Sequence, residues 1–451
     1  MVFCGFVALP VSLIQKASLL QWLKTGKVPQ LTTWGAWRYQ WADQMLPIKH
    51  INQSSGELVF DCSNSECDMS YWPPSHSMPY FVQDLLQELD QPGEVWLERS
   101  TGMLFIYPPD SARGVLEVST PVEWPSAELD EAALVRFVGV RSLRWEGIAI
   151  GQSRGTAVHA VNCTGLSLIN VSVRGMAVQA AVVSGGSNVT LSGWDVAQTG
   201  AGGVTLSGGD HATLTPCGHQ LIESDISDTD RWVHYESPPV KQIGVGTRVA
   251  HTFVHDVKHH AFRLEGNDHL IEANLVKRTL LEAWDAGTFH TGRDLTWQGN
   301  KLIDNVFMNN DSDATANFPC IGTTTSCAKV AIYLDDHQSG VTVTSNVISG
   351  FVGVFLHFGR NNNVSNNLFI GDGLSVAVAA CEVNDTTCNP PLSDPANALA
   401  ASLNATMSLP EWATVWLPHY PALRNVTWSP GATVNNTVSW ITLLCRSSAS
   451  Q

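Results

Sequence analysis

The stretch LIEANLV, at residues 270–276, decides the fold because its pattern returns along the chain. Apolar residues alternate with polar or small ones, as in a half-buried β-strand. Copies return about every 21 to 31 residues, and short strands at such a period predict a parallel β-helix. The copies are SLINVSV (167–173), TLSGWDV (190–196), LIESDI (221–226), RVAHTFV (248–254), LIEANLV (270–276), KLIDNVF (301–307), VTVTSNVI (341–348) and VSNNLFI (364–370).

The repeat divides the chain of 451 residues into three parts. We expect an all-β protein in which the β-helix spans residues 112–380. Residues 1–111 form an N-terminal capping region, in which two short apolar strands flank Ser100–Gly102 and predict a β-hairpin, preceded by a helix or turn at 81–89. Residues 381–451 lose the repeat and gain Pro, and we expect them to wrap the end of the solenoid.

Asn or Asp recurs within the copies, at residues 170, 195, 225, 274, 305, 346 and 367. Stacked in one column, amide side chains can hydrogen-bond between rungs and satisfy the backbone of the turns. We therefore predict a structural ladder at these positions. Phe253 stands at the equivalent place in the fourth copy, which predicts a break in the ladder.

The acidic composition makes some classes of binding partner unfavourable. The net charge is −16 and Lys plus Arg number only 25, so nucleic acid and anionic membrane surfaces are poor partners. A strongly polyanionic substrate is disfavoured for the same reason. No run of about 18 apolar residues is present, so we expect no membrane insertion. We also expect a monomer.

Cysteines and sequons both favour an oxidising compartment. Three close cysteine pairs lie in loop-like sequence without a His at zinc spacing, and we predict local disulfides rather than free thiols at Cys62–Cys67, Cys320–Cys327 and Cys381–Cys388. Ten N-x-S/T sequons favour a eukaryotic secretory pathway, although a chain rich in Ser, Thr and Asn yields several by chance. They begin at Asn52, Asn162, Asn170, Asn188, Asn310, Asn363, Asn384, Asn404, Asn425 and Asn435.

The first residues make a poor secretion signal. Residues 1–14 are apolar, but they have no cationic segment and they contain Pro10. We therefore expect a secreted or secretory-lumen protein whose natural N-terminal signal is missing from this chain.

Carboxylates concentrate at two successive repeats. Asp285 lies in WDAGTFHTGRD (284–294), and Asp335 and Asp336 lie in IYLDDHQSG (332–340). Rungs stack about 4.8 Å apart, so equivalent side chains one or two rungs apart are separated by roughly 5 to 10 Å. This range covers the carboxylate separations of both retaining and inverting glycosidases. We predict that these aspartates are catalytic, with turn capping beside Gly287 and Gly340 as the alternative.

The two roles would differ. One acid would protonate the glycosidic oxygen, and the other would attack the anomeric carbon or activate water, since neighbouring carboxylates push their pKa values apart. Other residues near the rung ends could bind the substrate, although each alone is more often structural. They are His260, Trp284, His290, Arg293, Tyr333, His337, His357 and Arg360.

Several longer motifs resemble right-handed parallel β-helix proteins related to glycoside hydrolase family 141, which includes α-L-fucosidase and xylanase activities. They are GNDHLIEANLV (266–276), WDAGTFHTGRD (284–294), AIYLDD (331–336) and FLHFGRNNNVSNNLF (355–369), with GAWRYQWAD (35–43) and ELDQPGEVWLERSTGMLFIYPP (88–109) upstream and WLPHYPAL (416–423) downstream. The resemblance implies a right-handed, pectate-lyase-like solenoid and glycan hydrolysis. It places the family's two candidate catalytic aspartates on Asp285 and on Asp335 or Asp336. Relatives commonly read D-D-A-G-x-x-Y-T-G-R-D, where this chain has Trp284 and His290.

We therefore predict an enzyme that hydrolyses a cell-wall or extracellular polysaccharide with an aspartate pair, without a cofactor or a metal. One alternative is a polysaccharide lyase on the same fold, which would use a Lys or Arg base and often Ca²⁺. The acidic net charge counts against the lyase. The other alternative is a non-catalytic solenoid that binds glycans, which Trp284 and the absence of the upstream rungs of relatives favour.

Overall fold

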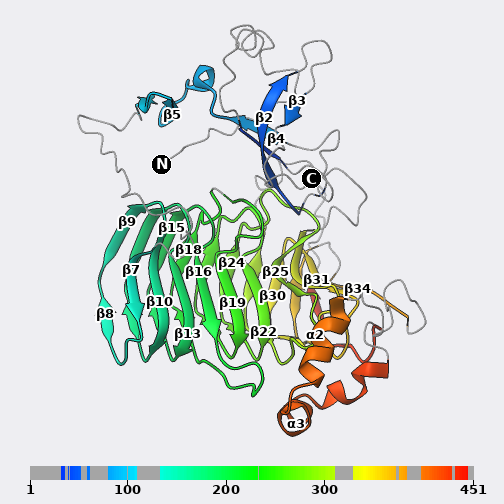
Figure 1. The fold of residues 1–451 in the computed structure, drawn as a ribbon. Helices are drawn as coiled ribbons and strands as arrows, with labels where there is room; N and C mark the ends of the chain where they lie inside the picture. The colour runs from blue at the N-terminus through cyan, green and yellow to red at the C-terminus, as the bar shows by residue number, and fades with distance from the viewer. Residues whose placement is uncertain are drawn as a thin grey trace. The chain divides into compact units, whose positions relative to one another are not determined.

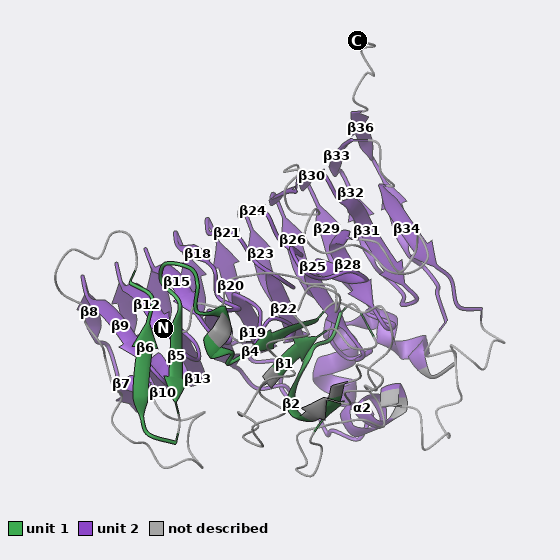
Figure 2. Ribbon diagram, turned by 90° about the horizontal axis from the view of Figure 1, so that it is seen from above, with its two compact units in different colours: residues 1–120, 317–323 green, residues 121–316, 324–451 purple. Residues whose placement is uncertain are grey.

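The computed structural model describes residues 32–35, 39, 41–51, 58–60, 80–98, 100–108, 133–231, 233–309, 329–371, 375–382, 398–428 and 432–444. The chain divides into two compact units (Figure 2). One unit comprises residues 1–120 and 317–323, and the other comprises residues 121–316 and 324–451.

The first unit contains a small antiparallel sheet and a hairpin. The sheet has the order β3-β2-β1-β4, with β1 (Thr32–Gly35), β2 (Gln44–Ile51), β3 (Leu58–Phe60) and β4 (Tyr80–Gln83). The predicted hairpin is formed by β5 (Val95–Glu98) and β6 (Met103–Ile106), with Gly102 at a φ of 72° in the turn. The expected helix or turn at 81–89 is the end of strand β4 followed by the short 3₁₀-helix η1 (Leu86–Glu88).

The second unit is a right-handed parallel β-helix, which confirms the predicted fold class (Figure 1). Three parallel sheets of ten strands each run along it. Sheet 1 contains β7 (Ala133–Val138), β10 (Thr156–Thr164), β13 (Ala181–Ser187), β16 (Val204–Gly208), β19 (Val240–Val245), β22 (Phe262–Asn267), β25 (Ala286–Gly292), β28 (Lys329–Asp335), β31 (Val352–His357) and β34 (Val376–Ala379).

The other two sheets consist of short strands that carry the sequence repeat. Sheet 2 contains β8 (Arg144–Glu146), β11 (Ser167–Ile169), β14 (Thr190–Ser192), β17 (Gln220–Ile222), β20 (Arg248–Ala250), β23 (Leu270–Glu272), β26 (Lys301–Ile303), β29 (Thr342–Thr344), β32 (Asn363–Ser365) and β35 (Thr437–Ser439). Sheet 3 contains β9 (Ala149–Ser153), β12 (Ser172–Met176), β15 (Asp195–Thr199), β18 (Asp225–Ser227), β21 (Phe253–His255), β24 (Leu275–Lys277), β27 (Val306–Met308), β30 (Val347–Ser349), β33 (Leu368–Ile370) and β36 (Thr442–Leu444).

The core of the solenoid is a set of stacked apolar columns. From β11 to β32, each short strand of sheet 2 turns its central residue inward, and these central residues pair rung by rung. Burying such a side chain stabilises the fold by about 1.5–3 kcal/mol. The fully buried column in sheet 2 consists of Leu168, Leu191, Leu221, Val249, Ile271, Leu302, Val343 and Val364.

The polar ladder is shorter than predicted. Asn274, Asn305, Asn346 and Asn367 form a buried stack, in which each Nδ2 donates to Oδ1 of the next at 2.9–3.0 Å. The prediction was wrong at residues 170, 195 and 225, which lie outside this column. Asp225 pairs with Phe253, and Phe253 pairs with Leu275, the residue after Asn274. The column of Asn274 therefore continues through the residues one position earlier, Thr252 and Ser224.

The amide ladder does stop at this rung, as predicted, but the residue in the column is Thr252 rather than Phe253. The backbone N–H of Thr252 donates to Oδ1 of Asn274 at 3.0 Å. Asn170 lies in a turn at a φ of 52°, where Asn tolerates the left-handed conformation.

Part of the C-terminal segment belongs to the solenoid itself. Strands β35 and β36 extend sheets 2 and 3 beyond the boundary expected at 380. Between them and β34 lie α2 (Ala398–Met407), the π-helix η3 (Trp412–Trp416), α3 (Leu417–His419) and the 3₁₀-helix η4 (Pro421–Trp428). These helices form a second apolar cluster with the solenoid, and its buried residues are Leu214, Leu295, Leu399, Leu403, Trp416, Tyr420, Leu423 and Val426.

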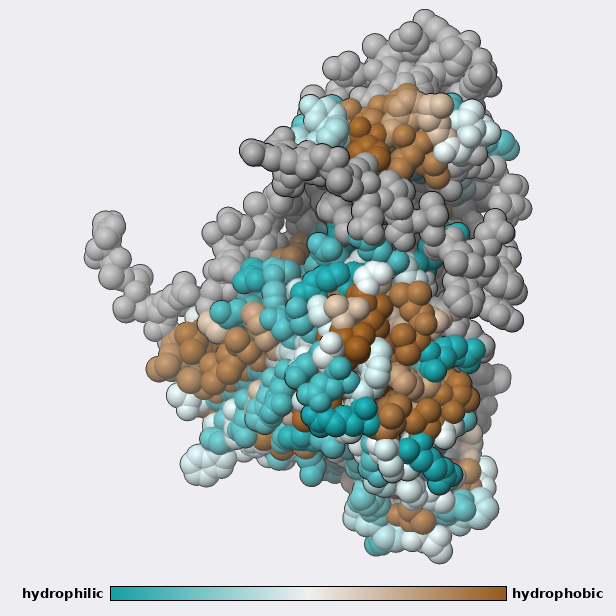
Figure 3. Space-filling view, turned by 90° about the vertical axis from the view of Figure 1, so that its left-hand side faces the viewer, coloured by the Kyte–Doolittle hydropathy of each residue, from teal (hydrophilic) through white to brown (hydrophobic). Residues whose placement is uncertain are grey.

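The first rung leaves apolar side chains in solvent. Figure 3 views this end of the solenoid and shows apolar surface interspersed with polar surface. Leu134 and Val138 on β7 are 48% and 62% exposed, and Leu143 is also exposed.

Among the described residues, no helix is both long and apolar enough to cross a membrane.

Of the six cysteines in the three predicted disulfides, the structure describes only Cys381. Cys381 is disulfide-bonded, whereas its predicted partner Cys388 lies outside the described residues. The pairs Cys62–Cys67 and Cys320–Cys327 also lie outside them. Cys163 and Cys217 are buried free thiols.

Candidate active site on sheet 1

Three neighbouring strands of sheet 1 carry the predicted site. Strand β25 pairs with β28, and β28 pairs with β31. His290 faces Tyr333, and Tyr333 faces Phe355, while Gly292 faces Asp335 at the end of β28. Parallel pairing in this register therefore brings together residues that are 22 positions apart between β28 and β31 and 43 positions apart between β25 and β28.

Asp335 lies at the centre of the site. Its Oδ1 is 2.6 Å from Nδ1 of His357, and its Oδ2 is 3.2 Å from Nε2 of His290. The backbone N–H of Asp336 also donates to Oδ1 at 2.8 Å. Burial raises the pKa of Asp335, but the hydrogen bonds of His290 and His357 and the charge of His357 outweigh burial and hold the pKa well below its ordinary value. Asp335 is therefore ionised.

Asp285 has the opposite environment. Burial raises its pKa first, and the charge of Asp335 raises it further, against smaller lowering effects from Tyr333 and His357. The Tyr333 hydroxyl donates to Oδ1 of Asp285 at 3.4 Å. Gly287 leaves room for this tyrosine, because a Cβ on Gly287 would lie 2.4 Å from Cβ of Tyr333.

Tyr333 remains a proton donor. Burial raises its pKa, and the charges of Asp335, Asp285 and Asp336 raise it further above the ordinary value. The phenol therefore stays protonated beside three aspartates. It can hold a carboxylate or a substrate oxygen, and it cannot serve readily as a base.

Asp336 forms an ion pair with Arg293. Its Oδ2 is 2.7 Å from Nε of Arg293, and the backbone N–H of Arg293 donates to the carbonyl of Asp336 at 3.0 Å. The Arg293 side chain is 63% exposed. Asp294 caps Thr296, and Glu282 pairs with His234.

A row of stacked rings leads away from Asp335 across the rungs. His290 stacks on His260 with ring centroids 4.4 Å apart, and His260 contacts His259 at 3.8 Å. Arg263 hydrogen-bonds Nδ1 of His290. Burial, followed by the charges of His260 and Arg263, lowers the pKa of His290 to about 4. His290 is therefore neutral at ordinary pH.

The other predicted binding residues lie in different surroundings. Trp284 packs beneath Lys329, whose Nζ is 4.5 Å from the ring centroid. His337 packs on Phe358 with centroids 4.9 Å apart. Arg360 is buried and donates to the carbonyl of Ala432 at 3.4 Å. Their roles in substrate binding stay predictions.

Two groups among the described residues bring ligand atoms close enough for a metal ion. They are Asp335, Asp336 and His357, and Glu236, His259 and His260. In the first group, Asp335 is held by histidines and Asp336 by Arg293, so we assign these residues to hydrogen bonding. Sequence reasoning missed Glu236, which lies in a turn without a repeat pattern and meets the histidines only because β19 and β22 pair.

The comparisons with known proteins add little. No family model matches the chain, and no curated protein matches it. A solved complex of the alginate lyase AlyF-OU02 with G6 is similar with a TM-score of 0.25 and 11% sequence identity. The match covers 57% of this chain and 58% of that chain, less than two thirds of its length. At this TM-score the similarity supports no conclusion, and the fold rests on the strand pairing above.

Proposed function

We propose that the protein is a carbohydrate-active enzyme that hydrolyses glycosidic bonds with Asp285 and Asp335. The observation that carries the proposal is the contrast between the two carboxyl groups. Burial and the neighbouring charge of Asp335 favour the protonated form of Asp285, whereas two histidines favour the ionised form of Asp335. A glycosidase needs one protonated carboxyl group as general acid and one ionised carboxylate as nucleophile or base.

In this mechanism Asp285 is the general acid and protonates the oxygen of the leaving sugar. Asp335 attacks the anomeric carbon or takes a proton from the attacking water. His290 and His357 orient Asp335, and Tyr333 orients Asp285. Arg293 is exposed and near Asp336, where it can hydrogen-bond sugar hydroxyls. Asp336 acts through Arg293 and through its charge on Asp285.

The finer assignments belong to the same proposal. The motifs around Asp285 and Asp335 support activity of the family 141 type, on an extracellular polysaccharide. The sequons support secretion and glycosylation. The lyase alternative receives less support, because Tyr333 is held protonated and Arg263 is engaged with Glu236 and Glu265, at 3.7 and 3.6 Å.

The test uses Asp285→Asn. Wild-type protein is screened against a panel of aryl glycosides and extracellular polysaccharides, and reducing ends are measured. Loss of the acid lowers the rate by about 10²–10⁴-fold, the usual contribution of general acid catalysis. The matched control is Asp195→Asn, which removes an exposed carboxylate paired with Arg174 on sheet 3 and leaves the rate unchanged.

Two results would contradict the proposal. An unsaturated uronyl product, detected by its ultraviolet absorbance, would identify a lyase. Binding of a polysaccharide that is equally strong in wild type and Asp285→Asn, without new reducing ends in either, would identify a glycan-binding solenoid.

A further inference from the structure

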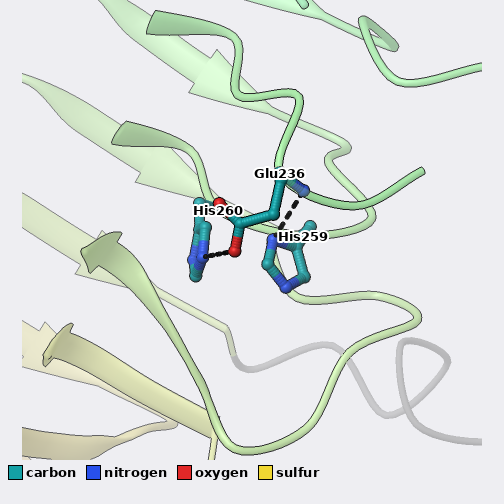
Figure 4. A group of neighbouring side chains, drawn as sticks. All are labelled: Glu236, His259 and His260. Carbon is teal, nitrogen blue, oxygen red and sulfur yellow. Dashed lines mark hydrogen bonds and ion pairs between the residues drawn. The ribbon is translucent and has the colours of Figure 1, made fainter. Parts of the chain in front are cut away.

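Glu236, His259 and His260 converge beside the row of rings (Figure 4). One ligand atom from each lies within 4.8 Å of the others. Both imidazoles are almost fully buried, at 1% and 2% exposure, whereas the Glu236 side chain is 51% exposed. The group is therefore fixed on the protein side and open to solvent on the side of Glu236.

Hydrogen bonding fixes the tautomer of His260. Its Nδ1 is 2.6 Å from the carbonyl oxygen of Gly287, which can only accept, so Nδ1 carries a proton. In the neutral ring, Nε2 then carries a lone pair. This Nε2 lies 3.5 Å from Oε1 of Glu236. Metal-bound histidines usually donate their other ring nitrogen to a carbonyl or carboxylate in this way.

His259 presents a second lone pair. Its Nδ1 accepts a hydrogen bond from the backbone N–H of Glu236 at 3.3 Å, which is long for such a bond. Its Nε2 is buried and has no hydrogen-bond partner among the described residues. Because Nδ1 accepts the hydrogen bond from Glu236, it carries a lone pair, which a metal ion could bind.

Glu236 supplies the negative charge. Its Oε2 lies 3.7 Å from the guanidinium of Arg263, which leaves Oε1 directed at His260. Glu236 also holds a φ of 55°, a left-handed conformation that is uncommon for Glu.

The separation between His260 and Glu236 suits a tetrahedral ion. Zinc binds His nitrogen at about 2.0–2.1 Å and carboxylate oxygen at about 2.0–2.2 Å, so two such ligands lie roughly 3.3–3.5 Å apart. The 3.5 Å between Nε2 of His260 and Oε1 of Glu236 agrees with this separation. Two imidazoles and one carboxylate also match the donor set of zinc sites that keep one position for water.

We propose that Glu236, His259 and His260 form a binding site for a divalent transition-metal ion, best fitted by zinc. Nδ1 of His259, Nε2 of His260 and Oε1 of Glu236 are the ligands, and solvent takes the fourth position. Binding gives up the long hydrogen bond to His259. The site lies one stacked ring from His290, which bonds Asp335, so the metal would stiffen the row of rings that leads to Asp335.

The experiment measures metal binding without a substrate, so it is independent of the proposed hydrolysis. Full-length protein is treated with a chelator, desalted and titrated with Zn²⁺ by calorimetry. Co²⁺ then reports the coordination through its visible absorption. We expect one zinc per chain, a four-coordinate Co²⁺ spectrum, and an affinity at least about 100-fold weaker in Glu236→Gln and in His260→Gln.

Matched controls separate this site from others. Glu265→Gln removes a carboxylate from the same sheet that pairs with Lys241, and it leaves zinc affinity unchanged. His357→Gln removes the second group of possible ligands and also leaves it unchanged. Circular dichroism of each variant checks folding. If His260→Gln does not fold, the zinc affinity of Glu236→Gln alone tests the site, because the half-exposed Glu236 side chain can be replaced without disturbing the core.

Three outcomes would overturn the proposal. Wild type could bind no zinc, which would mean that a proton on His260 pairs with Glu236 instead. Glu236→Gln could bind zinc as tightly as wild type. Zinc binding could be lost with His357→Gln rather than with the variants at Glu236 and His260.

Discussion

The Nδ1 atom of His357 lies 2.6 Å from Oδ1 of Asp335 on the neighbouring strand of sheet 1. Burial lowers the pKa of His357, but the hydrogen bond and charge of Asp335, together with the charges of Asp336 and Asp285, raise it above the ordinary value. The pair is therefore mutually stabilised as an ion pair. Asp285, which has the Tyr333 hydroxyl as its hydrogen-bond donor, lacks comparable stabilisation of its charge.

His357→Gln should shift the whole pH profile of activity to higher pH. The histidine lowers the pKa of Asp335, so its loss raises the pH below which Asp335 is protonated and the rate falls. The same charge lowers the pKa of Asp285, so its loss delays deprotonation of the acid as pH rises. Measurement of kcat/KM against pH checks both limbs. A profile that merely drops in height would contradict the assigned roles.

Asp336→Asn should move the alkaline limb of the pH profile to lower pH. Of the groups that face Asp285, Asp335 and Asp336 raise its pKa, while Tyr333 and His357 lower it. Removing the Asp336 charge lowers the pKa of Asp285, so the general acid loses its proton at lower pH. Asn tolerates the φ of 36° at this position. The control is Asp304→Asn, in an exposed turn with a φ of 58°, which should leave the profile unchanged.

Gly292→Ala should reduce kcat by at least about tenfold, because misplacing a catalytic group by about 1 Å can cost 100-fold. A Cβ on Gly292 would lie 2.4 Å from the carbonyl oxygen of Asp335, so the backbone of Asp335 must shift. Gly151→Ala is the control, since its Cβ would meet nothing closer than 3.9 Å. Equal kcat in the two variants would argue that Asp335 is not a reacting group.

Asn305→Ala should destabilise the solenoid by about 2–4 kcal/mol, since buried groups that lose their partners each cost about 1–3 kcal/mol. The backbone N–H of Asn274 and the carbonyl of Ile271 both lose their hydrogen bonds to the Asn305 side chain. Urea unfolding measures the change. The neighbouring Asp304→Asn should stay within about 0.5 kcal/mol of wild type. Equal midpoints for both variants would show that the stack is dispensable.

The solenoid could be predicted because its rungs repeat a local pattern. LIEANLV and its copies carry both the strand alternation and the period, and each copy forms strands of sheets 2 and 3. The register between copies could not be predicted as well. Asp195 and Asp225 were aligned one position away from the true column, because the turns tolerate several residue types and only pairing distinguishes the inward position.

The candidate site was predictable in its aspartates and less so in its partners. Asp285 and Asp335 lie in dense motifs between copies of the repeat. The distinction between Asp335 and Asp336 needed the structure, because strand β28 ends at Asp335 and the chain turns at Asp336. Glu236 could not be found, since it meets His259 and His260 only through the stacking of rungs.

The asparagine stack has a direction. Nδ2 of Asn274, Asn305 and Asn346 donates to Oδ1 of the rung that follows. At the start of the stack, the backbone N–H of Thr252 donates to Oδ1 of Asn274 in the same direction. A single reversed amide would set oxygen against oxygen, so the amides keep one orientation together. Duplication of a whole rung inside this run would preserve every bond of the stack. Such duplication is therefore the route by which a protein of this kind can lengthen during evolution with the least disturbance of its interior.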